Sequence, residues 1–189
     1  NAATRVAALL SGEIDLVTDA PVQDLGRIGG SAGHKVVSTP QMRTIFLGMD
    51  QGADELRSGN TGDNPFKKKE VRQAFYQAID IEAIKEKVMR GLSSPAGIIT
   101  FPGVTGYTKA LDERLPYDVA AAKQLLADAG YPDGFDIELR CPNDRYVNDE
   151  AICTAVVGML GKIGVNVSLF AQTKSKHFKE LKDNQGDFY

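Results

Sequence analysis

The sequence predicts a layered α/β fold, because stretches with helical periodicity alternate with stretches that have the periodicity of a strand. Residues 135–140 alternate apolar and polar side chains, as a half-buried strand does. Residues 148–163 carry apolar side chains at steps of three and four, and residues 165–169 alternate again. Helices and strands follow one another in this way along most of the chain, which favours helices packed on a sheet.

Composition and charge are those of an ordinary globular protein. The 189 residues are 42% hydrophobic and 25% charged, with a formal net charge of −3. This length suits one ample domain, or one domain with part of another. No apolar stretch is long enough to cross a bilayer, and the short basic run at residues 67–69 does not indicate a nucleic-acid surface. The chain opens within an expected helix and stops at an expected strand, so we expect a piece of a longer protein.

The N-terminal third is expected to contain two helices, a short strand and an extended segment. The first helix ends at Gly12, and "IDLV" at residues 14–17 is the strand. "PVQDLGRI" places a proline in the first turn of the second helix, where its missing N–H costs nothing. Residues 34–50 form an extended segment broken at Pro40, and a polar loop rich in Gly, Asn and Asp comes next.

The middle of the chain predicts two helices, an irregular stretch and a third helix. "KKKEVRQAFYQAIDIEAIKEKVMRG" is a helical block in two parts, with Asp80 as the N-cap of the second part. Residues 92–116 have no helical period, and long irregular stretches inside compact domains tend to be functional or disordered. The next helix has Asp118 as its cap and Gly130 as its stop.

The C-terminal part predicts strand, helix, strand and helix. Asn148 is a plausible N-cap of the first of these helices, with Asp149 and Glu150 in the first turn, where the helix dipole favours negative charge. Gly164 stands where a left-handed residue would end that helix. The strand at residues 165–169 follows, and "SKHFKELKDNQ" gives the last helix.

No arrangement of residues in the sequence requires catalysis or a bound cofactor. "GGSAGHK" echoes a phosphate-binding loop but lacks its spacing. His34 and His177 are the only histidines, and they lack the spacing of a zinc site. A G-x-S-x-G nucleophile elbow is missing as well. We therefore predict a protein that is not an enzyme and that carries no cofactor and no metal.

The two cysteines leave two interpretations open. Cys141 ends a strand and Cys153 lies in the second turn of the next helix, so the short loop between them lets the two approach. They are either a disulfide or two small buried apolar residues, since geometry rather than spacing decides the matter.

Five stretches resemble, in the same order, the extracellular solute-binding proteins of the peptide/nickel type, which serve ABC importers. They are "ALLSGEIDLV", "NPFKKKEVRQAFYQAIDIEAIKEKVMRG", "GY" at Gly106, "YDVAAAKQLLADAGYPDGF" and "NDEAICTAVVGMLGKIGVNV". Any one of these stretches could occur in many proteins, but all five in this order are specific to the family. The chain departs from the family at Asp50, where Asn is usual, and at residues 67–70, where the family often has an acidic helix cap.

The resemblance implies a periplasmic-binding-protein-like lobe of type II, that is, layered α/β with a mixed sheet and flanking helices. In this family two lobes joined by hinge strands close over a ligand. Residues 1–38 would be the end of lobe I and the approach to the hinge. Residues 39–189 would be most of lobe II, truncated before the return crossing to lobe I. The segment at residues 44–49 would be one hinge crossing, and a ligand-contacting stretch with tryptophan and an acid would follow Tyr189.

The function that the resemblance implies is that of the substrate-binding component of an ABC importer. Such a protein would bind a small solute between its lobes, namely a peptide-like molecule, an opine, a sugar or a metal chelate. It would act as a monomer in the periplasm, or as a membrane-anchored lipoprotein, and deliver the solute to a membrane permease. The alternatives are a non-transport ligand sensor and a hydrolase on a two-lobed scaffold; the lack of a nucleophile–base pair weighs against the latter.

The resemblance also places the loop between the strand at residues 135–140 and the next helix at the rim of the cleft. Ligands of open α/β sheets sit beyond strand carboxyl ends and near helix N-termini. Arg145 would offer a planar fork of donors to a ligand carboxylate. Tyr146 would offer a ring and a hydroxyl, and Asn148 would either cap the helix or contact the ligand. Tyr107, in the irregular stretch, is the fourth candidate.

Arg145 also has a purely structural interpretation. Its side chain could be solvated and paired with Asp144 or Asp149, both of which lie within four residues. The sequence leaves these two roles equally open.

Overall fold

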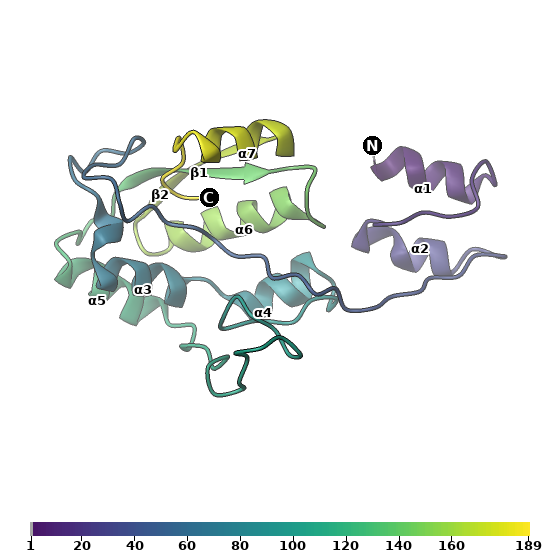
Figure 1. The fold of residues 1–189 in the computed structure, drawn as a ribbon, viewed down its shortest axis with the longest axis horizontal. Helices are drawn as coiled ribbons and strands as arrows, with labels where there is room; N and C mark the ends of the chain where they lie inside the picture. Colours follow the sequence, from purple (N-terminus) through teal and green to yellow (C-terminus); the bar gives the residue numbers. More distant parts are fainter. Residues whose placement is uncertain (1) are drawn as a thin grey trace.

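The computed structural model describes residues 2–189 as a small helical hairpin and a larger α/β body, joined by an extended segment (Figure 1). The helices and strands are α1 (Ala2–Leu10), η1 (Val22–Asp24), α2 (Leu25–Gly29), η2 (Pro65–Lys67), α3 (Lys69–Ala78), α4 (Ile81–Ala83), η3 (Ile84–Val88), α5 (Val119–Asp128), β1 (Asp136–Pro142), α6 (Asp149–Gly161), β2 (Asn166–Gln172) and α7 (Lys174–Lys182). Within these residues, no helix has the length and apolar character needed to cross a membrane.

The sheet of the body has two parallel strands, and isolated bridges in both directions extend it. β1 and β2 pair in parallel over the seven residues of each strand. Phe188 then bridges Leu139 of β1 in parallel and Met49 of the extended segment in antiparallel direction. The amide of Arg140 donates to the carbonyl oxygen of Phe188 at 3.0 Å. Residues 187–189 therefore lie between β1 and residues 48–50, although the two outer partners are far apart in sequence.

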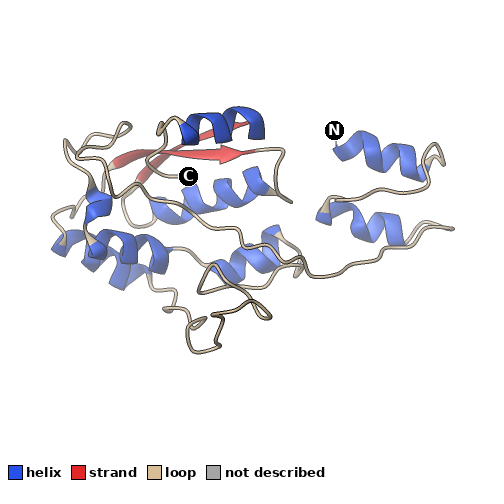
Figure 2. Ribbon diagram, viewed as in Figure 1, coloured by secondary structure: helices blue, strands red, loops and turns tan. Residues whose placement is uncertain are grey.

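Helices cover both faces of this sheet. α6 packs against β1 and β2 on one face, α7 packs against β1 on the other, and α3 packs against α5 farther from the strands (Figure 2). The core between these layers is aromatic and aliphatic, with Phe66, Phe75 and Phe188 fully buried against one another. This arrangement leaves the carboxyl ends of β1 and β2, where ligands of α/β sheets usually bind, at one end of the body.

The helical hairpin lies outside the core of the body. Val6 of α1 and Ile28 of α2 are buried, yet neither belongs to the core of the body. The predicted strand at residues 14–17 is wrong: these residues pair with no strand among those described, and Leu16 is 77% exposed. Four residues are too few to hold an extended conformation without a partner strand, so the segment runs as a bend between α1 and η1.

Most of the predicted helix boundaries are confirmed. The carboxylate of Asp80 accepts the amide of Ala83 at 2.9 Å, and that of Asp118 accepts the amide of Ala121 at 2.9 Å. Gly164 has a φ of +88°, a conformation that costs other residues energy. These signals are local, because each depends only on residues within one helical turn, which is why the sequence alone identifies them.

Candidate functional site

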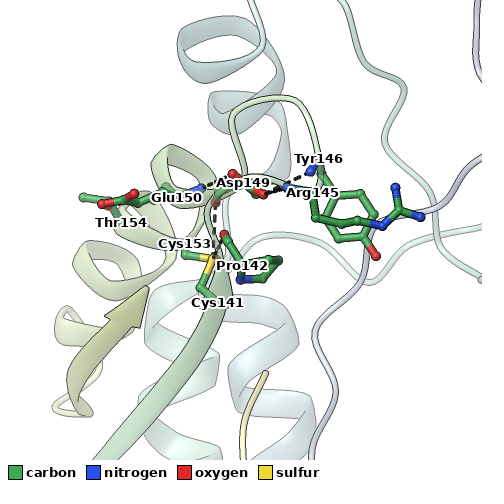
Figure 3. Close-up of a disulfide and its surroundings, with 8 residues drawn as sticks. All are labelled: Cys141, Pro142, Arg145, Tyr146, Asp149, Glu150, Cys153 and Thr154. Carbon is green, nitrogen blue, oxygen red and sulfur yellow. Dashed lines mark hydrogen bonds between the residues drawn. A yellow bond between two sulfur atoms is a disulfide. The ribbon is translucent and has the colours of Figure 1, made fainter. Parts of the chain in front are cut away.

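The loop of residues 143–148 leaves the carboxyl end of β1 and enters α6 (Figure 3). Its backbone is held by the buried carboxylate of Asp149. One oxygen of Asp149 accepts the amides of Arg145 at 2.9 Å and Tyr146 at 3.0 Å, and the other accepts the amide of Glu150 at 3.0 Å. Charge-assisted hydrogen bonds of this kind are stronger than neutral ones, so the loop has a defined shape before any ligand arrives.

The loop is also tied to α7. Asp144 accepts the amide of Lys174, the first residue of α7, at 2.5 Å. The amide of Asn143 donates to the carbonyl oxygen of Gln172 at the end of β2, at 2.9 Å. The start of α7, the end of β2 and the loop therefore form one continuous hydrogen-bonded edge.

A disulfide spans the same loop. Cys141 at the end of β1 is bonded to Cys153 in the second turn of α6, with their Cα atoms 6.6 Å apart (Figure 3). Both residues are buried. The bridge closes a loop of 12 residues in sequence separation, so it limits how far β1 and α6 can move apart.

Asn148 is the N-cap residue of α6, as predicted, but its side chain makes no capping hydrogen bond. Its φ is +56°, in the left-handed region that asparagine tolerates better than most residues. The side-chain amide instead donates to the carbonyl oxygen of Val88 at 2.9 Å, at the end of η3. The carboxylate of Asp149, one residue later, satisfies the amides around the helix start instead. Asn148 thus fastens the loop to the neighbouring helical turn.

Arg145 and Tyr146 extend away from α6, as Figure 3 shows. The guanidinium carbon of Arg145 lies 4.9 Å from the centre of the Tyr146 ring. That of Arg43, from the extended segment, lies 5.7 Å from the same centre. Neither arginine pairs with a carboxylate within residues 2–189. Both guanidinium groups therefore face solvent with their hydrogen-bond donors available.

The structural interpretation of Arg145 as a partner of Asp144 or Asp149 is wrong. Both carboxylates are used by backbone amides, Asp144 by that of Lys174 and Asp149 by three near the start of α6. Arg43 was not among the predicted site residues. It lies in an extended segment without periodicity, so nothing in the sequence marks which of its residues meets the loop.

Tyr107 stands apart from this cluster. Its hydroxyl donates to the carboxylate of Asp112 at 3.1 Å, and the other oxygen of Asp112 accepts the amide of Gly97 at 2.6 Å. Desolvation, together with the bond to Asp112, raises the pKa of Tyr107, and the Gly97 amide foremost lowers the pKa of Asp112. Among residues 2–189, no hydrogen bond, ion pair or ring contact joins Tyr107 to the loop of residues 143–148.

No cofactor-like or metal-like constellation accompanies the loop. In the part of the chain that the structure describes, no three His, Cys, Asp or Glu side chains gather so as to hold a metal ion. The chemistry that this edge of the body offers is recognition: a fixed backbone, one half-buried aromatic ring and two guanidinium groups without acidic partners among residues 2–189.

All 189 residues match the family described as bacterial extracellular solute-binding proteins, family 5 Middle. The chain belongs to this family. It is 28% identical over 191 residues to heme-binding protein A of Haemophilus influenzae, with 98% of the chain covered, and 25% identical over 178 residues to the glutathione-binding protein GsiB of Salmonella typhimurium, with 94% covered. Each comparison covers 32% of the relative, so the chain spans about a third of the length of these curated relatives.

Solved structures support the fold. The chain matches the agropinic-acid complex of AgaA from A. tumefacien R10 with a TM-score of 0.74 and 32% identity, over all of this chain and 36% of that one. It matches the nonapeptide complex of AppA from Bacillus subtilis with a TM-score of 0.81 and 24% identity, over all of this chain and 38% of that one. The predicted fold class, a layered α/β lobe of the type II periplasmic binding proteins, is confirmed. The family and these similar proteins are named for binding, not for catalysis.

Proposed function

We propose that the chain forms most of one lobe of a two-lobed receptor that captures a small solute outside the cytoplasmic membrane and delivers it to an ABC permease. Residues 1–38 would belong to the first lobe and its approach to the hinge, and residues 39–189 to the second lobe. Two features support this division: the hairpin shares no core with the body, and the connection between them is a single extended segment. Family membership and the similarity to solved receptors support the proposed role as a receptor.

Arg145 is the main solute-binding residue in this proposal. Its backbone is fixed by Asp149 and by the disulfide, while its guanidinium has no acidic partner among residues 2–189. A preorganised, unpaired fork of donors is suited to bind a carboxylate in two-point fashion. The carboxylate could belong to a peptide-like solute, an opine or a chelate.

The other candidates have distinct parts in this proposal. Tyr146 would pack its ring against the solute. Asn148 would position the loop through Val88 and would not touch the solute, because its side-chain amide already has a partner. Tyr107 would contact the solute with its ring alone, because its hydroxyl already donates a hydrogen bond to Asp112.

The proposed role is binding without catalysis, in the periplasm or on the outer side of the cell membrane. Closure of the two lobes would be driven by contacts with the solute that exist only in the closed state. The closed receptor would then dock on its permease. The solutes named for similar proteins differ widely, so they support the class of protein and not one solute.

The test uses the full-length protein that carries this chain. Native mass spectrometry of the purified protein weighs any solute that stays bound. Arg145→Ala should weaken the binding of that solute by about 1.5–3 kcal/mol, the range for a hydrogen bond to a charged group. The melting temperature without solute should hardly move, because the side chain is exposed.

The matched control is Lys123→Ala, which removes one positive charge from the exposed face of α5. It should leave both affinity and melting temperature unchanged. Unchanged affinity in Arg145→Ala, or an equal loss of stability without solute, would assign Arg145 to the structure instead.

A further inference from the structure

Two arginines from distant parts of the sequence share one aromatic ring. Arg43 comes from the extended segment and Arg145 from the loop before α6, yet both guanidinium groups lie within 6 Å of the centre of the Tyr146 ring, at 5.7 and 4.9 Å. Hydrogen bonds fix the backbone at or next to both arginines. The hydroxyl of Thr44, next to Arg43, donates to the carbonyl oxygen of Ile99 at 2.7 Å, and the amide of Arg145 donates to Asp149.

The charge of this cluster is not balanced by the protein. None of the ion pairs within residues 2–189 includes Arg43 or Arg145. The two nearest acids along the loop, Asp144 and Asp149, are occupied by backbone amides. The Tyr146 ring attracts each cation through its negative face, but it cannot neutralise either one. Two positive charges thus lie near the same ring and repel each other. The binding of an anion would relieve this repulsion.

If a cleft closed over this cluster, the free-energy cost of the two unpaired positive charges would rise. Desolvation strengthens electrostatic interactions, and a charge that is buried without a partner is costly. A solute with one carboxylate could satisfy Arg145 and would leave Arg43 unpaired. A solute with two anionic groups would satisfy both, and its body would lie against the Tyr146 ring.

We propose that Arg43 is a second anion-binding residue of this site and that the site selects solutes with two anionic groups, one for each guanidinium. The proposal rests on the proposed function, because it names the class of solute for the same site. Carboxylates and phosphates share the oxygen geometry that arginine recognises, so either can supply the two groups.

The experiment has two parts, both on the full-length protein. In the first, the solute that elutes from the denatured wild-type protein is esterified with acidic methanol, and the gain in mass counts its carboxyl groups. Treatment with phosphatase detects a phosphate monoester. We expect two acidic groups in total; the esterification and phosphatase arms tell dicarboxylates from phosphorylated solutes.

In the second part, calorimetry measures the affinity of the same eluted solute for Arg43→Gln, Arg145→Gln, the double variant and Lys123→Gln. Each arginine variant should lose about 10- to 100-fold in affinity, as expected for a hydrogen bond to a charged group. The double variant should lose more than either single variant. Lys123→Gln makes the same change in net charge on α5 and should bind like the wild type.

The outcomes separate this proposal from the one it rests on. If Arg145→Gln loses affinity while Arg43→Gln binds like Lys123→Gln, the receptor function stands and the role of Arg43 is overturned. A solute with only one acidic group overturns the proposal as well, because no second anionic group would then be present for Arg43. If no solute binds, the receptor function itself fails and this inference fails with it.

Discussion

The two loops that carry the predicted site residues differ in what their polar groups do. In the loop of residues 143–148, a buried carboxylate, a disulfide and two contacts to α7 and β2 hold the backbone. The side chain of Arg145 is therefore left exposed and that of Tyr146 half-buried, both without acidic partners. In the stretch of residues 92–116, the structure depends on the side chains themselves, since Asp112 binds Tyr107 and Gly97.

The difference shows what makes a loop residue suitable for binding. A side chain can meet a ligand at little cost when other groups already hold its backbone, because little conformational entropy is then lost on binding. Tyr107 has to give up its bond to Asp112 before its hydroxyl can serve a ligand. The guanidinium of Arg145 has no hydrogen bond or ion pair to give up, only its contact with the Tyr146 ring. Three predictions test this contrast, starting with the largest effect.

Removing the disulfide should cost the most. Replacing Cys141 and Cys153 together by alanine should lower the free energy of unfolding by about 3 kcal/mol, as the loss of loop-closure entropy predicts. Denaturant titration measures the change. Intact-mass analysis with and without reductant before alkylation checks the bridge in full-length protein purified without reductant. Two freely alkylated thiols in that material would contradict the bridge.

Removing the carboxylate of Asp149 should cost somewhat less. Asp149→Ala leaves three amides without their acceptor and should lower the free energy of unfolding by about 2 kcal/mol. The control is Asp118→Ala, which removes an exposed N-cap of α5 and should cost about 1 kcal/mol. Solute affinity in the full-length protein should fall for Asp149→Ala alone. Equal affinities would mean that the shape of the loop does not matter for binding.

Changes at Tyr107 should have the smallest effect. Tyr107→Phe removes the hydroxyl that binds Asp112 and keeps the ring, so solute affinity should change by no more than roughly twofold, as for an ordinary surface substitution. Tyr107→Ala removes the ring as well and should weaken binding if the ring contacts the solute. Calorimetry on the two variants separates these roles. A large loss in Tyr107→Phe would show that the hydroxyl leaves Asp112 for the solute.

The sequence predicted well those features that depend on neighbouring residues. The caps at Asp80 and Asp118 and the stop at Gly164 were found because each signal lies within a few residues of its effect. The strand at residues 14–17 was wrong, since strands need a partner that local patterns do not reveal. Asn148 was assigned as a cap from its type and position, but a contact with Val88, 60 residues away, decides its orientation.

The candidate site was predictable only in part, because some of its residues meet only through long-range contacts. Arg145 and Tyr146 could be chosen because they stand between a strand and a helix, where binding residues are often found. Arg43 could not, because only the folded chain brings the extended segment to the Tyr146 ring. Tertiary structure also determines which carboxylates already have partners, and it excludes the pairing of Arg145 with Asp144 or Asp149.

The position of Phe188 has a bearing on how the body folds. Phe188 bridges β1 and the segment near Met49, both earlier in the chain, and the neighbouring ion pair of Asp187 with Arg57 joins residues 130 positions apart. Contacts of such high sequence separation slow folding, because a long loop must close before they form. Until residues 187–189 arrive, β1 and the segment near Met49 expose unpaired edges and an incomplete aromatic core. Newly made chains would therefore pass through an aggregation-prone stage, and a chaperone that shields strand edges would raise the yield of folded protein.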